Sequence, residues 1–184
     1  LWHYDASDRI THRTVNGENY RRGEDYLAAQ LAMNDGSCMT FILPDEGVSP
    51  ETLLKREGFL TEIAEQDDYG KIRWSVPKFE ASSTVELEDA LKELGITDAF
   101  DADRADFSPL TDDGAYVSNV TQAARVKVDE QGVEAAAYTE IGIRCALPPE
   151  NLPVVEMNLN RPFLFVIRQG DVPLFIGTVQ TLEA

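Results

Sequence analysis

The sequence has few of the residue types from which most catalytic and metal sites are built. Its 184 residues include only two histidines and two cysteines. Cys38 and Cys145 form no CxxC pair, and two thiols cannot make the disulfide framework of a small secreted scaffold. Glycine-rich phosphate loops and the HExxH and GxSxG motifs are absent. The sequence therefore predicts a protein that is not an enzyme and that uses neither a metal ion nor a cofactor.

Positive charge and long apolar runs are also scarce. There are 33 acidic residues against 16 basic ones, a formal net charge of -17. Such a surface repels phosphate groups, which argues against nucleic acid and anionic membrane as partners. No apolar run approaches the ~20 residues that span a bilayer. With 43% apolar residues, the chain is nevertheless long enough to bury one sizeable core.

Two groups of residues match known functional sites only in part. Four aspartates, Asp101, Asp103, Asp106 and Asp112, invite comparison with a calcium-binding loop. An EF-hand loop, however, requires glycine at its sixth position, which here is Asp106. Cys145 lies more than 130 positions from either histidine and lacks the local signature of a catalytic thiol. The pattern therefore favours a solvated acidic loop and no thiol nucleophile.

The first quarter of the chain has the pattern of antiparallel strands. Asn16-Gly17 and the Asn-Asp-Gly run at 34–36 tolerate positive φ, which predicts hairpin turns at both places. The apolar run 38–43 predicts a buried strand that Pro44 ends. Further strands are predicted at 74–79 and from about residue 124 onward, with two very apolar ones at 163–167 and 172–179.

Two helices are predicted between these strands. Ser49-Pro50-Glu51 has an N-cap, a first-turn proline and an acid near the positive end of the helix dipole, which predicts a helix running into the sixties. Ser83 and Glu86 have the spacing of a capping box. The apolar face that follows, closed by Gly95, consists of Leu87, Ala90, Leu91 and Leu94. The predicted fold class is α+β, richer in strand than in helix.

The stretch from Ala124 to Leu147 carries an unusual pattern. Val126 and Val128 alternate with charged residues, as in a half-buried strand. Beyond Gly132 the odd-numbered residues up to position 145 are all small or apolar, while the even-numbered ones are mostly polar. The alanines at 135–137 nevertheless have poor strand propensity. The segment is either one that slips between two packed strands or an ordinary edge strand running into a proline-rich loop.

Several motifs resemble the C-terminal half of a serpin, in the order expected for that family. Asp129–Thr139 is similar to the serpin hinge, and Met157–Ile167 to the family signature. The remaining matches are Phe41–Gly47, Val76–Phe79, Leu94–Phe100, Ala105–Ser108 and Pro173–Gly177. The resemblance implies that residues 1–184 are the C-terminal part of a single serpin domain. It also implies a multi-sheet fold of mainly antiparallel strands, completed by an N-terminal half.

The resemblance implies a suicide-type inhibitor of serine endopeptidases. Residues 132–153 would be its hinge and reactive-centre loop, which inserts into the large β-sheet after cleavage. The hinge residues are Gly132, Val133, Glu134, Ala135, Ala136 and Ala137. Lys78 and Glu130 match a salt-bridged pair where the loop joins the sheet. Family resemblance also implies an extracellular or secreted protein, although a signal peptide is not observable in this sequence.

The position of the reactive bond is left between two alternatives. The usual family spacing from the hinge glycine places it at Ala146–Leu147, which suits an elastase-like protease. Arg144–Cys145 would suit a trypsin-like protease. Val133 stands where threonine or another small residue is usual in the family, and Gln122 stands where many members have histidine. The rival interpretations are a non-inhibitory serpin and a β-rich binding module. The isolated chain is expected to bind its N-terminal half, to dimerise or to aggregate.

Overall fold

The computed structural model describes the chain except for residues 1–2, 5–9, 34, 130–131, 134–150 and 181–184. It consists of two compact units. The first comprises Leu1–Glu80 and Lys127–Ala184, and the second comprises Ala81–Val126. Within the described ranges, no helix is long and apolar enough to cross a membrane.

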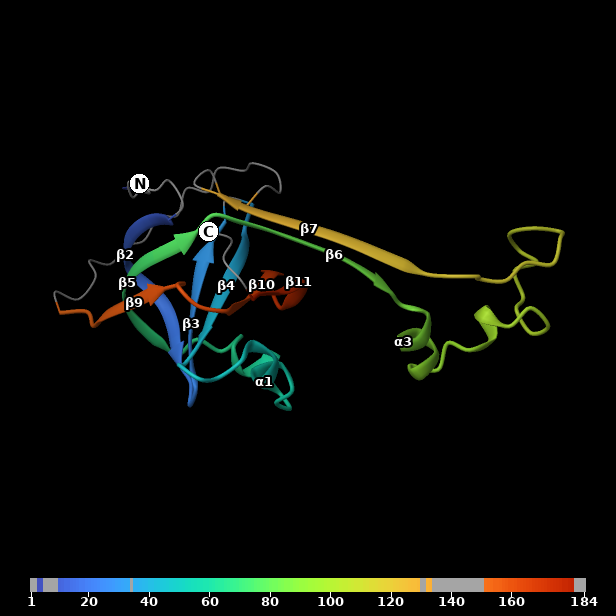
Figure 1. Ribbon diagram of the computed structural model, residues 1–184, viewed down its shortest axis with the longest axis horizontal. Helices are drawn as coiled ribbons and strands as arrows, with labels where there is room; N and C mark the ends of the chain where they lie inside the picture. The colour runs from blue at the N-terminus through green and yellow to red at the C-terminus, as the bar shows by residue number, and fades with distance from the viewer. Residues whose placement is uncertain (1–2, 5–9, 34, 130–131, 134–150, 181–184) are drawn as a thin grey trace. The chain divides into compact units, whose positions relative to one another are not determined.

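The first unit contains a large, mainly antiparallel sheet (Figure 1). Its strand order is β11-β10-β4-β3-β2-β5-β9, with β1 paired to β2. Among the strand pairs that the structure describes in this sheet, β5 and β9 alone are parallel. The strands are β1 (His3–Tyr4), β2 (Ile10–Arg22), β3 (Tyr26–Ala32), β4 (Ser37–Pro44), β5 (Asp68–Pro77), β9 (Val154–Asn158), β10 (Phe163–Gln169) and β11 (Val172–Val179). The predicted antiparallel strands and the predicted fold class are thus confirmed.

Side chains cover both faces of this sheet. On one face Ile42 and Leu164, which are cross-strand partners, join a buried cluster with residues of the two short helices. On the other face Phe41 packs edge-on against Trp74 and Phe163, with ring centroids 5.8 and 6.0 Å apart. Because β4 and β10 are buried on both sides, their sequences are nearly continuous apolar runs instead of alternating ones.

The helix predicted after Ser49 is confirmed at its start but not along its length. Ser49 is the N-cap, and its Oγ accepts a hydrogen bond of 3.3 Å from the Thr52 backbone N–H. The segment forms two short helices, α1 (Pro50–Leu54) and α2 (Phe59–Glu62). Gly58 lies between them with φ 73°. A residue at positive φ cannot continue a right-handed helix, so the predicted single helix is wrong.

One of the two predicted hairpin turns is an irregularity inside a strand. Gly17 lies within β2, where the pairing with β5 shifts register between Asn16 and Glu18. Its φ of 78° favours glycine, and a side chain there would also have to displace the end of the Tyr69 ring. The turn that contains Gly36, at φ 81°, does connect β3 to β4, with Asn34 outside the described residues.

The second unit begins in β6 (Phe79–Glu86) and continues through α3 (Glu88–Glu93) and the 3-10 turn η1 (Asp98–Phe100) to β7 (Thr121–Asp129). Strands β6, β7 and β8 (Gly132–Val133) form a three-stranded sheet in that order. The strand predicted at 74–79 is the end of β5 and the start of β6, separated at Lys78.

The predicted capping box at Ser83 is wrong. Ser83 lies within β6, and α3 begins after Leu87 without any side-chain cap. The Leu87 backbone N–H donates instead to the Val120 carbonyl, 2.8 Å away. This long-range hydrogen bond continues the pairing of the two segments beyond the predicted start of the helix. Ser83 is therefore part of a strand and does not cap a helix. Gly95 does end the helix, with φ 95°.

Candidate functional site

The predicted hinge begins as a short strand against β7. β8 pairs antiparallel with β7, and Val133 lies opposite Val128 while Gly132 lies opposite Asp129. Exposure alternates along β7: Lys127 is exposed, whereas Val126 and Val128 are each only 8% exposed. The alternation predicted for this strand is confirmed. β7 therefore presents one buried face along the line where the hinge starts.

The far end of the predicted loop is joined to a different strand. The Lys71 backbone N–H donates to the Pro153 carbonyl over 2.8 Å, and Lys71 is then the parallel partner of Val154 at the start of β9. Gly70 permits this approach, because a Cβ there would lie 3.0 Å from the same Pro153 oxygen. The two described ends of the loop are thus held by β7 and by β5.

Most of the predicted loop residues lie outside the described part of the chain. These are Glu130 of the proposed pair, Glu134, Ala135, Ala136 and Ala137 of the hinge, and the two candidate bonds Ala146–Leu147 and Arg144–Cys145. Lys78, the other member of the pair, is half-buried at the junction between β5 and β6. The structure therefore places the strands that flank the loop and one half of the predicted ion pair.

Of the two charged residues beside the hinge, Lys127 is exposed and Asp129 is half-buried. Lys127 and Asp129, two positions apart on β7, approach to 3.4 Å between Nζ and Oδ2. An ion pair of this kind contributes roughly 0–1 kcal/mol, because water screens it and two side chains lose freedom. It therefore adds little to the energy that holds β7 in place.

Two carboxylates of the acidic loop in the second unit, those of Asp101 and Asp106, accept hydrogen bonds from nearby residues. Asp101 Oδ1 accepts from the Asp103 backbone N–H at 2.9 Å, and this bond lowers the pKa of Asp101. The Ser108 hydroxyl and backbone N–H together lower the pKa of Asp106. Within the described residues, no group of three or more His, Cys, Asp or Glu side chains could hold a metal ion.

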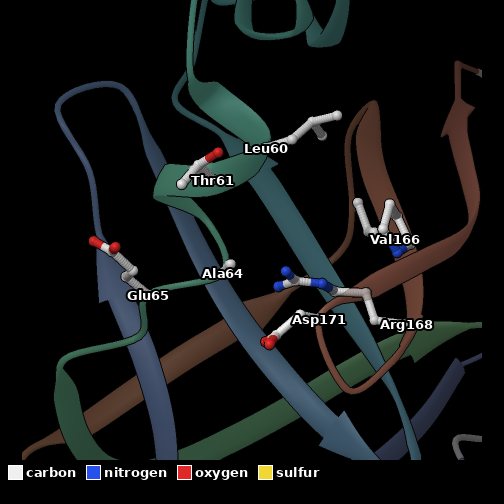
Figure 2. Close-up of a pocket in the computed structure, with 8 residues that line it drawn as sticks. Leu60, Thr61, Ala64, Glu65, Val166, Arg168 and Asp171 are labelled. Carbon is white, nitrogen blue, oxygen red and sulfur yellow. The ribbon is translucent and has the colours of Figure 1, made fainter.

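A pocket of about 440 Å³ lies beside α2 (Figure 2). Arg168 extends from β10 toward the segment after α2, with Asp171 beside it. The full lining is Leu60, Thr61, Ala64, Glu65, Val166, Arg168, Asp171 and Pro173. The volume suits a small molecule. The lining includes no histidine or cysteine and no nucleophile paired with a base, so the pocket could bind a ligand but has no catalytic constellation.

The described thiol, Cys38, is also unsuited to nucleophilic chemistry. Cys38 is half-buried on β4, and burial raises its pKa more than Gln30 and Arg168 lower it. A raised pKa keeps the group as a thiol, and the thiolate is the reactive form. The other thiol considered from the sequence, that of Cys145, lies outside the described residues.

Sequence patterns did not identify one polar contact that positions α2. The Tyr26 hydroxyl donates to Glu62 Oε1 over 2.9 Å, which ties β3 to α2. Arg21 Nε lies 3.5 Å from the same carboxylate oxygen. Burial, followed by the bond to Glu62, raises the pKa of Tyr26 to about 12. From the sequence pattern, a tyrosine in an apolar strand is expected to be a core residue. Its polar partner becomes visible only in the packed structure.

The chain matches the family model described as Serpin (serine protease inhibitor) over residues 10–182. It is 36% identical over 162 residues to Iripin-5 of Ixodes ricinus, which covers 84% of this chain and 40% of that protein. It is 40% identical over 107 residues to plasminogen activator inhibitor 1 of Neovison vison, covering 56% of this chain and 26% of that protein.

The fold is similar to that of solved serpin structures. A thermophilic serpin, tengpin, in its native state superposes with a TM-score of 0.71 and 33% sequence identity, over 94% of this chain and 46% of that chain. The chain thus spans less than half the length of each of these relatives.

Proposed function

The chain belongs to the serpin family, and from that premise we propose that it acts, together with an N-terminal half of the fold, as a suicide-type inhibitor of serine endopeptidases. In keeping with the family's description as serine protease inhibitors, the protein would mimic a protease substrate and would not itself be an enzyme. One observation carries the proposal: the hinge already pairs with β7 at Val128 and Asp129. An extended peptide can add to a sheet by continuing such a ladder.

The register of this pairing supports insertion of the loop with one particular face inward. If the ladder between β7 and β8 continues residue by residue, Ala135 comes opposite Val126, as Val133 already lies opposite Val128. Directly opposite residues share a face of the sheet. The face of Val126 and Val128 is the buried one. The small and apolar odd-numbered residues of the loop would therefore be buried, and its polar even-numbered residues would face solvent.

The inhibited reaction is an interrupted peptide hydrolysis. The protease serine attacks the carbonyl carbon of the reactive residue, the peptide C–N bond breaks, and an ester joins the two proteins. We propose Ala146 as that residue, with an elastase-like target, and Arg144 with a trypsin-like target as the alternative. Insertion of the released strand before water hydrolyses the ester traps the protease. Stored strain in the uncleaved fold drives that step.

Lys78 is proposed to pair with Glu130 where the loop joins the sheet. Its half-buried position between β5 and β6 reduces solvent screening compared with a surface pair. The desolvation cost of both charges offsets most of the attraction, so the pair would set the register of the hinge more than it stabilises the fold. We further propose that the protein is secreted and meets its target proteases outside the cell.

The second candidate function is that of a non-inhibitory serpin that carries a small ligand. The pocket beside α2, with its volume of about 440 Å³ and its guanidinium group from Arg168, favours this reading. A carrier would need no loop insertion. The two functions are therefore separated by whether a covalent complex with a protease forms.

The test mixes the full-length protein, including the N-terminal half, with elastase and with trypsin. We expect a complex with elastase that survives SDS, and a new N-terminus at Leu147 by mass spectrometry. A complex with trypsin and a new terminus at Cys145 would move the reactive residue to Arg144. Cleavage without any covalent complex would support the non-inhibitory alternative.

A matched pair of variants tests the buried face. Ala135→Glu places a charge on the face proposed for burial, where an unpaired ion costs several kcal/mol. We expect slower insertion, so that the ester is hydrolysed and the variant becomes a substrate. Ala136→Glu adds the same charge to the solvent face and should leave complex formation near the wild-type level. Equal complex formation by both variants would show that the proposed register is wrong.

A further inference from the structure

In the irregular segment immediately before β7, an asparagine makes two side-chain contacts with its neighbours. The Ser118 hydroxyl donates to Asn119 Oδ1 over 3.2 Å, and Asn119 Nδ2 lies 3.4 Å from Thr121 Oγ1. The first contact assigns the oxygen of the amide as an acceptor, which directs its NH₂ group toward the threonine hydroxyl. Asn119 and Thr121 are both exposed.

These residues form the tripeptide Asn119-Val120-Thr121. An asparagine followed by any residue except proline and then by serine or threonine is the acceptor sequence for N-linked glycosylation. None of the other asparagines in the 184-residue sequence has serine or threonine two positions later. Asn119-Val120-Thr121 is therefore the one acceptor sequence in these 184 residues.

We propose that Asn119 is an N-glycosylation site. The step transfers an oligosaccharide from a lipid-linked pyrophosphate donor: a bond forms between Asn119 Nδ2 and the first sugar carbon, and the bond from that carbon to the pyrophosphate oxygen breaks. The lipid pyrophosphate leaves with the electron pair, and the amide nitrogen gives up one proton to an enzyme base. The hydroxyl of Thr121, next to Nδ2, is the group that orients this amide.

The folded chain leaves room for the product. Asn119 is exposed, and the backbone next to it is already fixed, because the Val120 carbonyl accepts from Leu87 N–H at 2.8 Å. Thr121, Arg125 and Lys127 are exposed along β7, while Val126 and Val128 face the other way and are buried. A glycan at the start of this strand therefore extends into solvent without disturbing the buried face.

The proposal rests on the proposed secretion of the protein, because only a chain in the secretory pathway meets the glycosylating enzyme. The test removes that dependence by expressing the full chain behind a cleavable signal sequence in a eukaryotic secretory cell, with a separate acceptor tripeptide appended at its C-terminus as a positive control. Glycosylation of the appended tripeptide, verified first, shows that the chain has entered the pathway.

We expect the wild-type chain to carry one more glycan than the appended control alone. A glycosidase that converts the linked asparagine to aspartate should mark position 119 in the peptide mass spectrum. Asn119→Gln and Thr121→Ala should lose this glycan, whereas Thr121→Ser should keep it, because the hydroxyl is retained. An unmodified position 119 beside a glycosylated control tripeptide would overturn the site. Such a result would leave the protease experiment, and hence the inhibitor proposal, untouched.

Discussion

Strands β10 and β7 are both predicted from the sequence, yet they have very different surroundings. All residues from Phe163 to Ile167 in β10 are at most 6% exposed. In β7 only Val126 and Val128 are below a tenth exposed. β10 lies between two strands of a sheet that the first unit covers on both faces. A strand pattern thus predicts which face can be buried, while the packed neighbours decide whether it is.

The helices of the two units differ in the same way. Leu53 of α1 is fully buried in the cluster against the sheet, whereas Leu94 at the end of α3 is 80% exposed. The other large exposed apolar residues of the second unit are Val85, Ile96, Leu110 and Tyr116. Leu53 is thus packed against the sheet of its own unit, whereas Leu94 is left exposed at the end of α3.

The largest expected effect comes from removing core volume on one side of this comparison. Leu164→Ala should lower the free energy of unfolding by about 2–5 kcal/mol, because Leu164 is 1% exposed and its loss leaves a cavity. Leu94→Ala removes the same atoms from an exposed site and should change it by less than about 0.5 kcal/mol. Urea unfolding of the two purified variants measures both. Comparable losses would mean that α3 is packed as tightly as β10.

A second prediction concerns the hydrogen bond from Tyr26 to Glu62, which ties α2 to the sheet. No comparable bond is among the described interactions of α3. Tyr26 has a pKa of about 12 in the folded chain against an ordinary value of 10.0. The folded state binds this proton more tightly, so the stabilisation is fully present below pH 10 and is lost as the pH rises through about 12.

The measurement is unfolding stability of the wild type and of Tyr26→Phe across this alkaline range. We expect stability to fall with pH more steeply in the wild type than in the variant, which has no hydroxyl to ionise. Parallel pH curves would show that folding does not raise the pKa of Tyr26.

The smallest expected effect separates a true helix cap from a false one. Ser49→Ala removes the hydroxyl that accepts from Thr52 N–H and should cost about 1 kcal/mol. Ser83→Ala changes an exposed strand residue with no capping role and should stay within about 0.5 kcal/mol. Thermal or urea unfolding distinguishes the two. A larger loss of unfolding free energy for Ser83→Ala than for Ser49→Ala would indicate that Ser83 caps a helix, contrary to the structure.

Sequence reasoning was most successful where neighbouring residues decide the outcome. The cap at Ser49 and the helix end at Gly95 each involve groups a few positions apart, and both are confirmed. The buried strand ended by Pro44 is confirmed as well. Reasoning from local patterns was wrong at Ser83, because a distant carbonyl, that of Val120, extends the strand pairing past it. The residues of the predicted reactive loop could be named only from family resemblance.

By itself the sequence determined the order of the serpin motifs, the α+β class and the alternation along β7, because these depend on composition and on periods of a few residues. Only the tertiary structure decided that Gly17 sits in a bulge, that Gly58 divides a helix and that Val133 lies opposite Val128. Each of those outcomes depends on a contact or a backbone angle set by packing. The register of a strand is set by the pairing that buries its apolar face. Because the partner strand can lie far away in the sequence, local patterns do not predict that register.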